Sequence, residues 1–131
     1  MQNMQIPQDM SYTSLPIDSF DDEFKKLSKD YEIHKTKQVK KFIDEHNPLL
    51  AYINAITPLI NKYFPEYKKC IIFSEDPEFE GLDDITIYIK SFKSSFDSDW
   101  KRLDELEDEL FYITEFSRKI KSLVSLDLWL K

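Results

Sequence analysis

The chain has 131 residues, of which 41% are hydrophobic and 33% are charged, and its net charge at pH 7 is −7. This size and this balance of apolar and charged residues predict one folded domain and exclude a chain that is disordered throughout. Glycine occurs once, which excludes the nucleotide-binding loops that need several glycines to bring the backbone close to a phosphate.

Secretion and membrane insertion are also disfavoured. The first ten residues, MQNMQIPQDM, lack the basic start and the apolar stretch of a secretory signal. No apolar run reaches the length of a membrane span. Cys70 is the only cysteine, so no intramolecular disulfide can form. We therefore expect a cytoplasmic protein that does not enter a membrane.

The N-terminal residues differ in composition from the rest of the chain. Residues 1–17 are rich in Gln, Ser, Thr and Pro, and their apolar residues show no periodicity. Such a composition is typical of a flexible tail. Residues 18–131 are expected to form a single α+β domain.

Apolar residues at steps of three and four predict helices in the first half of this domain. The first apolar stripe consists of Phe20, Phe24, Leu27 and Tyr31. After a bend near residues 32–36, a second helical face spans residues 39–43, and a third run spans residues 49–64. Pro58 lies inside the third run and predicts a kink or an end there, because proline has no amide donor. Two or three N-terminal helices are therefore expected.

In the second half of the domain, the spacing of apolar residues predicts strands on either side of a helix. Residues 70–73 form a short β-rich run, and residues 85–90 alternate isoleucine with other residues at the period of two that marks a strand. Helical spacing returns over residues 97–116, and alternation returns over residues 124–130. This order is that of a β-β-α-β unit.

The expected fold is a two-layer α+β sandwich, in which the N-terminal helices lie on one face of a small three-stranded mixed sheet. A right-handed crossover makes the second and third strands of this sheet parallel. The first strand would then lie between them and run antiparallel to both.

The loop between the first two predicted strands is rich in carboxylates, which are good ligands for hard divalent cations. The loop lacks the D-x-[DN]-x-[DN]-G spacing of an EF-hand, and acidic turns are more often simply solvated. Its candidate ligands are Glu75, Asp76, Glu78, Asp83 and Asp84. They define an alternative hypothesis, a small divalent-metal-dependent enzyme or ligand binder that uses loop 75–84.

The helix predicted from residue 97 carries a second group of carboxylates, which lie between the positions of its apolar stripe. Most of them should therefore face water, where they have no catalytic advantage. His34 and His46 show no metal-ligand spacing, and no Ser–His–Asp arrangement follows from the sequence. We expect no catalytic residue and no cofactor.

Charge is distributed unevenly along the chain, because residues 25–41 contain seven lysines against Asp30 and Glu32. Solvation of an exposed face is the first explanation for this basic segment. Docking on the protein's own acidic helix, or on that of a second copy, comes next. Nucleic-acid binding comes last, because arginine is absent from the segment and aromatic residues do not alternate with its lysines.

Surplus aromatic residues and the lack of catalytic patterns favour a small, acidic, non-enzymatic protein-interaction domain, which binds a protein partner or forms a homodimer. Trp129 lies on the minority face of the last predicted strand, where a large aromatic residue can mark a contact. The interaction residues expected on this basis are Phe20, Phe24, Leu27, Tyr31 and Trp129.

Overall fold

The computed structural model describes residues 17–75, 78 and 83–130, which form an α+β fold with five helices and one four-stranded mixed sheet. In chain order, the elements are α1 (Ile17–Asp30), β1 (Glu32–Ile33), α2 (Thr36–Glu45), α3 (Leu49–Tyr63), β2 (Lys69–Ser74), β3 (Asp84–Ser91), α4 (Phe96–Phe111), α5 (Arg118–Lys121) and β4 (Val124–Leu130). None of these helices has the length and the apolar composition that a membrane span needs. Of the predicted tail, residues 1–17, all but Ile17 lie outside the described residues.

The strand order of the sheet is β1-β2-β3-β4. β1 and β2 are parallel, β2 and β3 are antiparallel, and β3 and β4 are parallel, with Ile87 opposite both Ile71 and Leu126. The second and third expected strands, β3 and β4, run parallel as predicted, but they pair directly with each other. Two expectations are wrong: the sheet has four strands instead of three, and β3, not β2, lies between the other two long strands.

The burial of β3 explains its central position. Its side chains at 85, 86, 87, 89 and 91 are all buried, and they include both faces of the sheet, as expected of a strand with a neighbour on each side. β4 lies at the edge of the sheet and exposes every second side chain, namely Ser125, Asp127 and Trp129. The unexpected strand β1 has only two residues, which are too few to show a period of two in the sequence.

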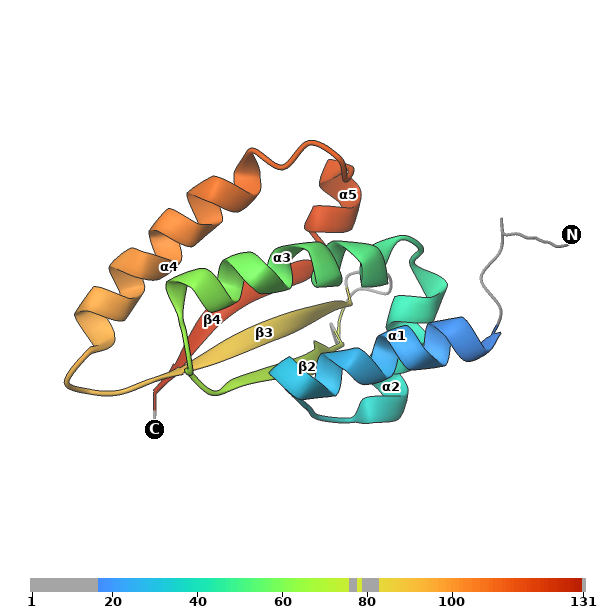
Figure 1. Cartoon of the computed structure of the whole chain (residues 1–131), viewed down its shortest axis with the longest axis horizontal. Helices are drawn as coiled ribbons and strands as arrows, with labels where there is room; N and C mark the ends of the chain where they lie inside the picture. Colours follow the sequence, from blue (N-terminus) through green and yellow to red (C-terminus); the bar gives the residue numbers. More distant parts are fainter. Residues whose placement is uncertain (1–16, 76–77, 79–82, 131) are drawn as a thin grey trace, which may run out of the picture.

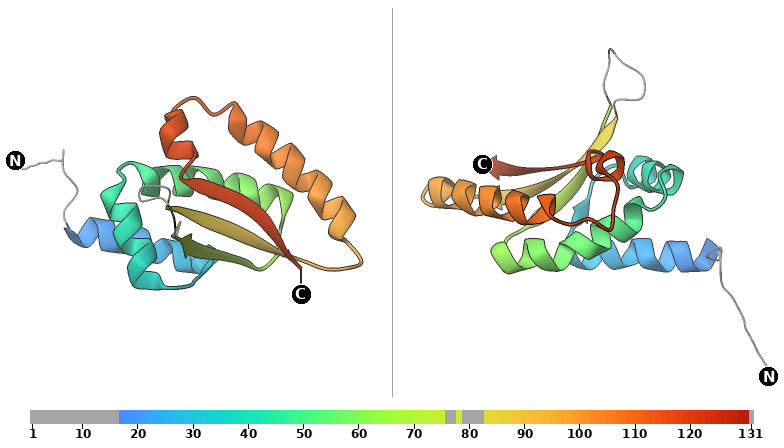
Figure 2. Two further views of the ribbon diagram at one scale, coloured as in Figure 1. Left: turned by 180° about the vertical axis from the view of Figure 1, so that it is seen from behind. Right: turned by 90° about the horizontal axis from the view of Figure 1, so that it is seen from above.

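Of the helices α1, α2 and α3, α1 and α3 cover one face of the sheet as predicted, whereas α2 packs against α3 and β2 (Figure 1). Seen from behind, the sheet lies in front of α3, and α4 runs beside β4 (Figure 2). The fully buried side chains of the core come mainly from α3 and β3 and include Ile53, Ile56, Ile60, Ile85, Ile87 and Ile89, and α1 adds Leu27. The core therefore lies between the sheet and the helical layer.

Two helices differ from the sequence-based expectation. α3 continues past Pro58 to Tyr63 instead of ending. The Thr57 hydroxyl donates a hydrogen bond to the Ile53 carbonyl oxygen at 2.7 Å, and Ile60 beyond the proline is fully buried. Burial of this apolar face outweighs the one amide bond that the proline removes. α4 ends at Phe111, five residues earlier than the apolar spacing suggested, and α5 follows as a separate short helix.

A buried hydrogen bond joins α1 to α3. The hydroxyl oxygens of Tyr31 and Thr57 lie 2.8 Å apart, and Tyr31 is only 3% exposed. Burial raises the pKa of Tyr31 to about 12, against a smaller opposing effect of the hydrogen bond to Thr57. The neutral phenol is therefore the form that the folded state requires.

We expect Tyr31 to make the domain sensitive to alkali. The phenol of an unfolded chain has a pKa of about 10, so the contribution of Tyr31 to stability is complete below that pH and is lost as the pH rises towards about 12. Urea unfolding at a series of alkaline pH values should show this decline, and Tyr31→Phe should reduce it. An undiminished decline in the phenylalanine variant would contradict this assignment.

Candidate interaction surface

The large apolar side chains that remain exposed gather in one region of the described chain. They are Phe92, Trp100, Phe111, Tyr112, Trp129 and Leu130. All six belong to α4, to residues beside its two ends, or to β4, and α4 packs against both α3 and β4. We call this region, which comprises α4, residues 92 and 112, and β4, the α4–β4 surface (Figures 1 and 2).

At one end of the α4–β4 surface, a lysine lies between two aromatic rings. Lys90 on β3 is opposite Trp129 on β4. The Lys90 Nζ lies 5.8 Å from the centre of the Phe92 ring and 5.9 Å from that of the Trp129 ring. Trp129, an expected interaction residue, is 37% exposed. The structure thus places this tryptophan in an exposed cation–π cluster.

At the other end of the surface, two neighbouring aromatic rings point into solvent. Phe111 and Tyr112 follow one another at the end of α4 and are 70% and 77% exposed. Their ring centres lie 5.5 Å apart in an edge-to-face arrangement. Exposed aromatic residues are typical contact residues in protein interfaces. Their exposure does not follow from the sequence, because the apolar spacing predicts that the helix continues past them to residue 116.

A groove of about 480 Å³ opens between α3, α4, α5 and β4. It is lined by the apolar or aromatic side chains of Tyr52, Ile56, Leu110, Phe111, Val124 and Leu126 and by the polar side chains of Glu107, Lys121, Ser122 and Ser125. A volume of this size falls in the range of about 300–1,000 Å³ that binding pockets occupy. The groove therefore joins the exposed aromatic pair to the edge strand of the sheet.

The two helices on either side of this groove carry opposite charge. Burial raises the pKa of the Glu107 carboxyl, and the negative charges of Asp104, Asp127 and Asp108 raise it further. α4 as a whole carries seven carboxylates against Lys101 and Arg102. α5 carries Arg118, Lys119 and Lys121, of which Lys121 lines the groove.

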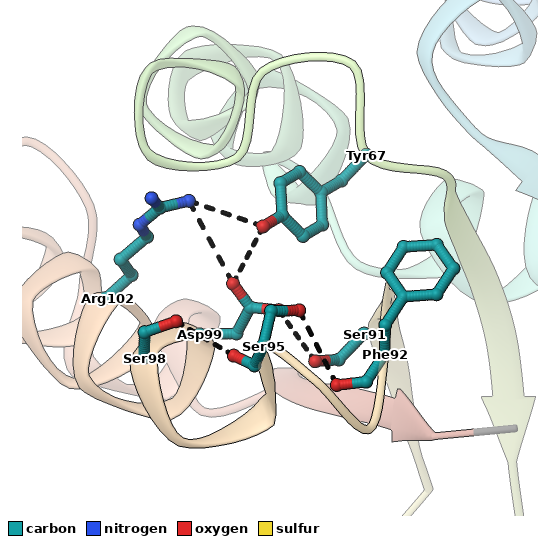
Figure 3. A network of polar contacts seen from close by, with 7 residues as sticks. All are labelled: Tyr67, Ser91, Phe92, Ser95, Ser98, Asp99 and Arg102. Carbon is teal, nitrogen blue, oxygen red and sulfur yellow. Dashed lines mark hydrogen bonds and ion pairs between the residues drawn. The ribbon is translucent and has the colours of Figure 1, made fainter.

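One carboxylate of α4 is buried in a network of polar contacts, shown in Figure 3. Asp99 accepts hydrogen bonds from the hydroxyl groups of Ser91 at 2.6 Å, Tyr67 at 2.8 Å and Ser95 at 2.9 Å. Arg102 donates to the Tyr67 hydroxyl at 3.3 Å and lies 3.9 Å from the Asp99 carboxylate. The network joins the start of α4 to the end of β3 and to the segment before β2.

The hydrogen bonds decide the ionisation of Asp99. Burial alone would raise its pKa, but the hydrogen bonds from Ser91, Tyr67 and Ser95 and the charge of Arg102 together lower it. The ionised carboxylate is therefore stable in the interior, and it serves to fix α4 in place rather than to accept protons.

Asp99 is an exception to the expectation that most acidic side chains of this helix face water. That expectation is confirmed for Asp97 and Asp104, which are exposed, but Asp99 is completely buried. A signal for it exists in the sequence. Asp99 extends the stripe of Leu103, Leu106 and Leu110 backwards by four residues, so it lies on the buried face of the helix.

The other expected interaction residues lie away from the α4–β4 surface. Phe24, Leu27 and Tyr31 are buried in the core of this chain, and Phe20 packs against it. The basic segment 25–41 is thus attached to its own domain through its apolar face. Its lysines face outward, and Lys40 pairs with Asp21 at 2.6 Å.

The structure describes only part of the acidic loop. Of the five candidate metal ligands, Asp76 lies outside the described residues, whereas Glu75, Glu78, Asp83 and Asp84 are described. Asp84 accepts a hydrogen bond from Ser125 at 3.1 Å. Over residues 17–75, 78 and 83–130, no group of three or more carboxylate, histidine or cysteine side chains is placed to hold a metal ion.

Comparison of the chain with models of protein families, with curated proteins and with solved structures finds no match.

Proposed function

We propose that this chain is a small, non-enzymatic protein-interaction domain that works in the cytoplasm and binds a protein partner or a second copy of itself through the α4–β4 surface. The observation that carries the proposal is the segregation of exposed apolar side chains. The exposed large hydrophobic residues of the described chain all lie on this surface, and none lies on α1, α2 or α3. Exposed large apolar side chains that are confined to one side of a domain can mark an interaction site.

The rigidity of the surface supports the same proposal. Asp99 holds the start of α4 to β3 and to Tyr67 through three hydroxyl donors. A surface held in place before binding loses little conformational freedom when a partner arrives. Phe111 and Tyr112 are the best candidates for contact residues, because they are the most exposed aromatic side chains described.

The double variant Phe111→Ser/Tyr112→Ser tests the proposal. We expect the wild-type protein to self-associate in sedimentation velocity at micromolar concentration, or to form a specific complex after cross-linking in its host cell. The double variant should lose this association, because it removes two exposed aromatic contacts while the core stays intact.

A matched control comes from the opposite side of the molecule. Lys25→Ser/Lys29→Ser changes two exposed side chains on α1 and should leave the association unchanged. A wild-type protein that remains monomeric, together with cross-linked complexes identical to those of the double variant, would refute the proposed function.

A further inference from the structure

We infer that the face of the sheet opposite α1 and α3 binds the same face of a second copy of the chain, with the strands of the two copies antiparallel. This inference goes beyond the proposed function, because it assigns the second copy to a face that excludes α4 and its exposed pair Phe111 and Tyr112. Three features carry it: an uncovered, uncharged centre, a rim whose charges are complementary to one another, and an area that suits a weak dimer.

One face of the sheet is not covered by any helix of the described chain. α1 and α3 lie on the other face, and the view from behind shows no helix in front of β3 or β4 (Figure 2). Side chains of a strand alternate between the two faces of its sheet. Ile71, Ile85, Ile87 and Ile89 belong to the core on the helical side. The strand register therefore assigns the even-numbered residues of β2 and β3, the odd-numbered residues of β4, and Glu32 of β1 to what we call the open face.

The centre of the open face carries no charge. Its four side chains form two cross-strand pairs between β2 and β3, namely Cys70 with Tyr88 and Ile72 with Thr86. Cys70 and Thr86 are buried between their neighbours, whereas Ile72 and Tyr88 are partly exposed. Cys70, Ile72 and Tyr88 take no part in the hydrophobic core on the helical side. A largely apolar centre inside a polar rim is the usual anatomy of a protein interface.

The rim of the open face is nearly neutral. Lys90 lies near one end of β3, where its amide donates to the Lys68 carbonyl oxygen, and Asp84 lies at the other end. Glu32 and Asp127 lie on the two edge strands. Two lysines against three carboxylates give this face a net charge of −1, whereas the whole chain carries −7. A second copy is therefore repelled less here than at the acidic α4.

The rim charges are complementary to one another under a twofold axis that crosses the strands at the level of Ile87. In such a dimer, residue i contacts residue j of the second copy and j contacts i. Lys90, three residues beyond Ile87, meets Asp84 of the second copy, three residues before it. The same axis places Glu32 opposite His34 of the second copy, because the two residues lie on either side of this level. An axis along the strands would instead bring the lysines together, so the antiparallel arrangement is favoured.

The size of the open face suits a weak dimer. β3 has eight residues and the sheet has four strands. At about 3.3 Å per residue and about 4.8 Å between strands, the face covers roughly 500 Å². Two copies would bury roughly 1,000 Å², which is near the lower limit of specific interfaces. Trp129 lies on the same face and adds an exposed aromatic ring at the Lys90 end. We therefore expect a dissociation constant in the micromolar range.

Repulsion between the acidic α4 helices of the two copies is limited in this arrangement. Each α4 lies beside the edge of its own sheet (Figure 2), and two packed sheets lie about 10 Å apart. Exposed charges at this separation are largely screened at physiological salt, where the Debye length is about 8 Å.

A charge exchange between Lys90 and Asp84 tests the inference with the full chain. Six residues of extended strand hold the two positions about 20 Å apart in one copy, so their side chains can pair only between copies. Lys90→Glu and Asp84→Lys should each raise the dissociation constant of the dimer at least about tenfold, because each places like charges across the twofold axis. The double variant Lys90→Glu/Asp84→Lys should restore most of the affinity. Sedimentation velocity over a concentration series measures all four proteins.

Lys25→Glu is the matched control for Lys90→Glu. It reverses the charge of an exposed lysine on α1, on the opposite side of the sheet, and should leave the dissociation constant unchanged. Circular dichroism checks that every variant folds. A wild-type protein that is monomeric at about 100 μM would overturn the inference, since that concentration far exceeds the expected dissociation constant. A double variant that dimerises no better than the single variants would overturn it as well.

The variant Phe111→Ser/Tyr112→Ser distinguishes this inference from the proposed function. If it keeps the dimer but loses the complexes that form on cross-linking in the host cell, the open face binds the second copy and the α4–β4 surface binds a different protein. If it loses the dimer while Lys90→Glu keeps it, the inference is wrong and the proposed function stands. If the charge exchange behaves as expected but Phe111→Ser/Tyr112→Ser changes neither the dimer nor the complexes, the inference stands and the proposed function is wrong.

Discussion

Replacing Phe24 with aspartate should unfold most of the domain. Phe24 is 6% exposed, stacks on Phe20 with ring centres 6.3 Å apart, and lies under the Lys40 ammonium group at 6.0 Å. The substitution removes a buried aromatic ring worth about 1.5–3 kcal/mol and places a carboxylate in the core. We expect the free energy of unfolding to fall by at least about 3–5 kcal/mol, measured by urea denaturation with circular dichroism.

Exposed lysines near Phe24 supply the control for this prediction. Lys25, Lys29 and Lys37 are all exposed, and their replacement by glutamine should leave the urea midpoint nearly unchanged. Lys40 is left in place because it pairs with Asp21. A lysine variant that folds normally but loses a salt-dependent affinity for nucleic acid would contradict the interpretation of this face as solvated.

Replacing Asp99 with asparagine should loosen the start of α4. The carboxylate accepts hydrogen bonds from three hydroxyl groups, and the amide of asparagine carries no charge and presents a donor where an oxygen is needed. Hydrogen bonds to a charged group contribute about 1.5–3 kcal/mol each, but the hydroxyl groups can partly rearrange. We therefore expect a loss of about 2–4 kcal/mol in the free energy of unfolding.

The pH dependence of Asp99→Asn separates the effect of charge from that of packing. The folded state lowers the pKa of Asp99 below the value of about 3.9 in an unfolded chain. Its contribution to stability is therefore complete above that pH and is lost as the pH falls towards the lower folded-state pKa. The variant should differ most from wild type near neutral pH and least in acid. A difference that stays constant with pH would mean that only packing is lost.

Most helices and strands of this fold follow from local periodicity. The alternation of Ile85, Ile87 and Ile89 identifies β3, and the stripe from Phe20 to Tyr31 identifies α1, because each pattern is long enough to distinguish a period of two from one of 3.6. β4 was identified for the same reason. The order of the strands did not follow, because periodicity shows which face of a strand is buried but not which neighbours it has.

The candidate surface was much harder to predict than the fold. Trp129 was identified from its place on the minority face of β4, but the exposure of Phe111 and Tyr112 depends on where α4 ends. The groove is formed by residues from α3, α4, α5 and β4, so it exists only in the tertiary structure. In the sequence, Glu107 looks the same as its acidic neighbours, and only the folded structure shows that it lines the groove.

The parallel pairing of β3 and β4 has a consequence for the order of folding. Ser74 and Asp84, at the near ends of β2 and β3, pair across a short connection, whereas Ile85 meets Val124 only after α4 and α5 have been crossed. Closing the longer connection costs more chain entropy. The β2–β3 pair can therefore form before β4 joins the sheet. A partner bound to the α4–β4 surface would bind only the chain in which this late step is complete. Its binding energy would therefore add directly to the stability of the last-formed part of the fold.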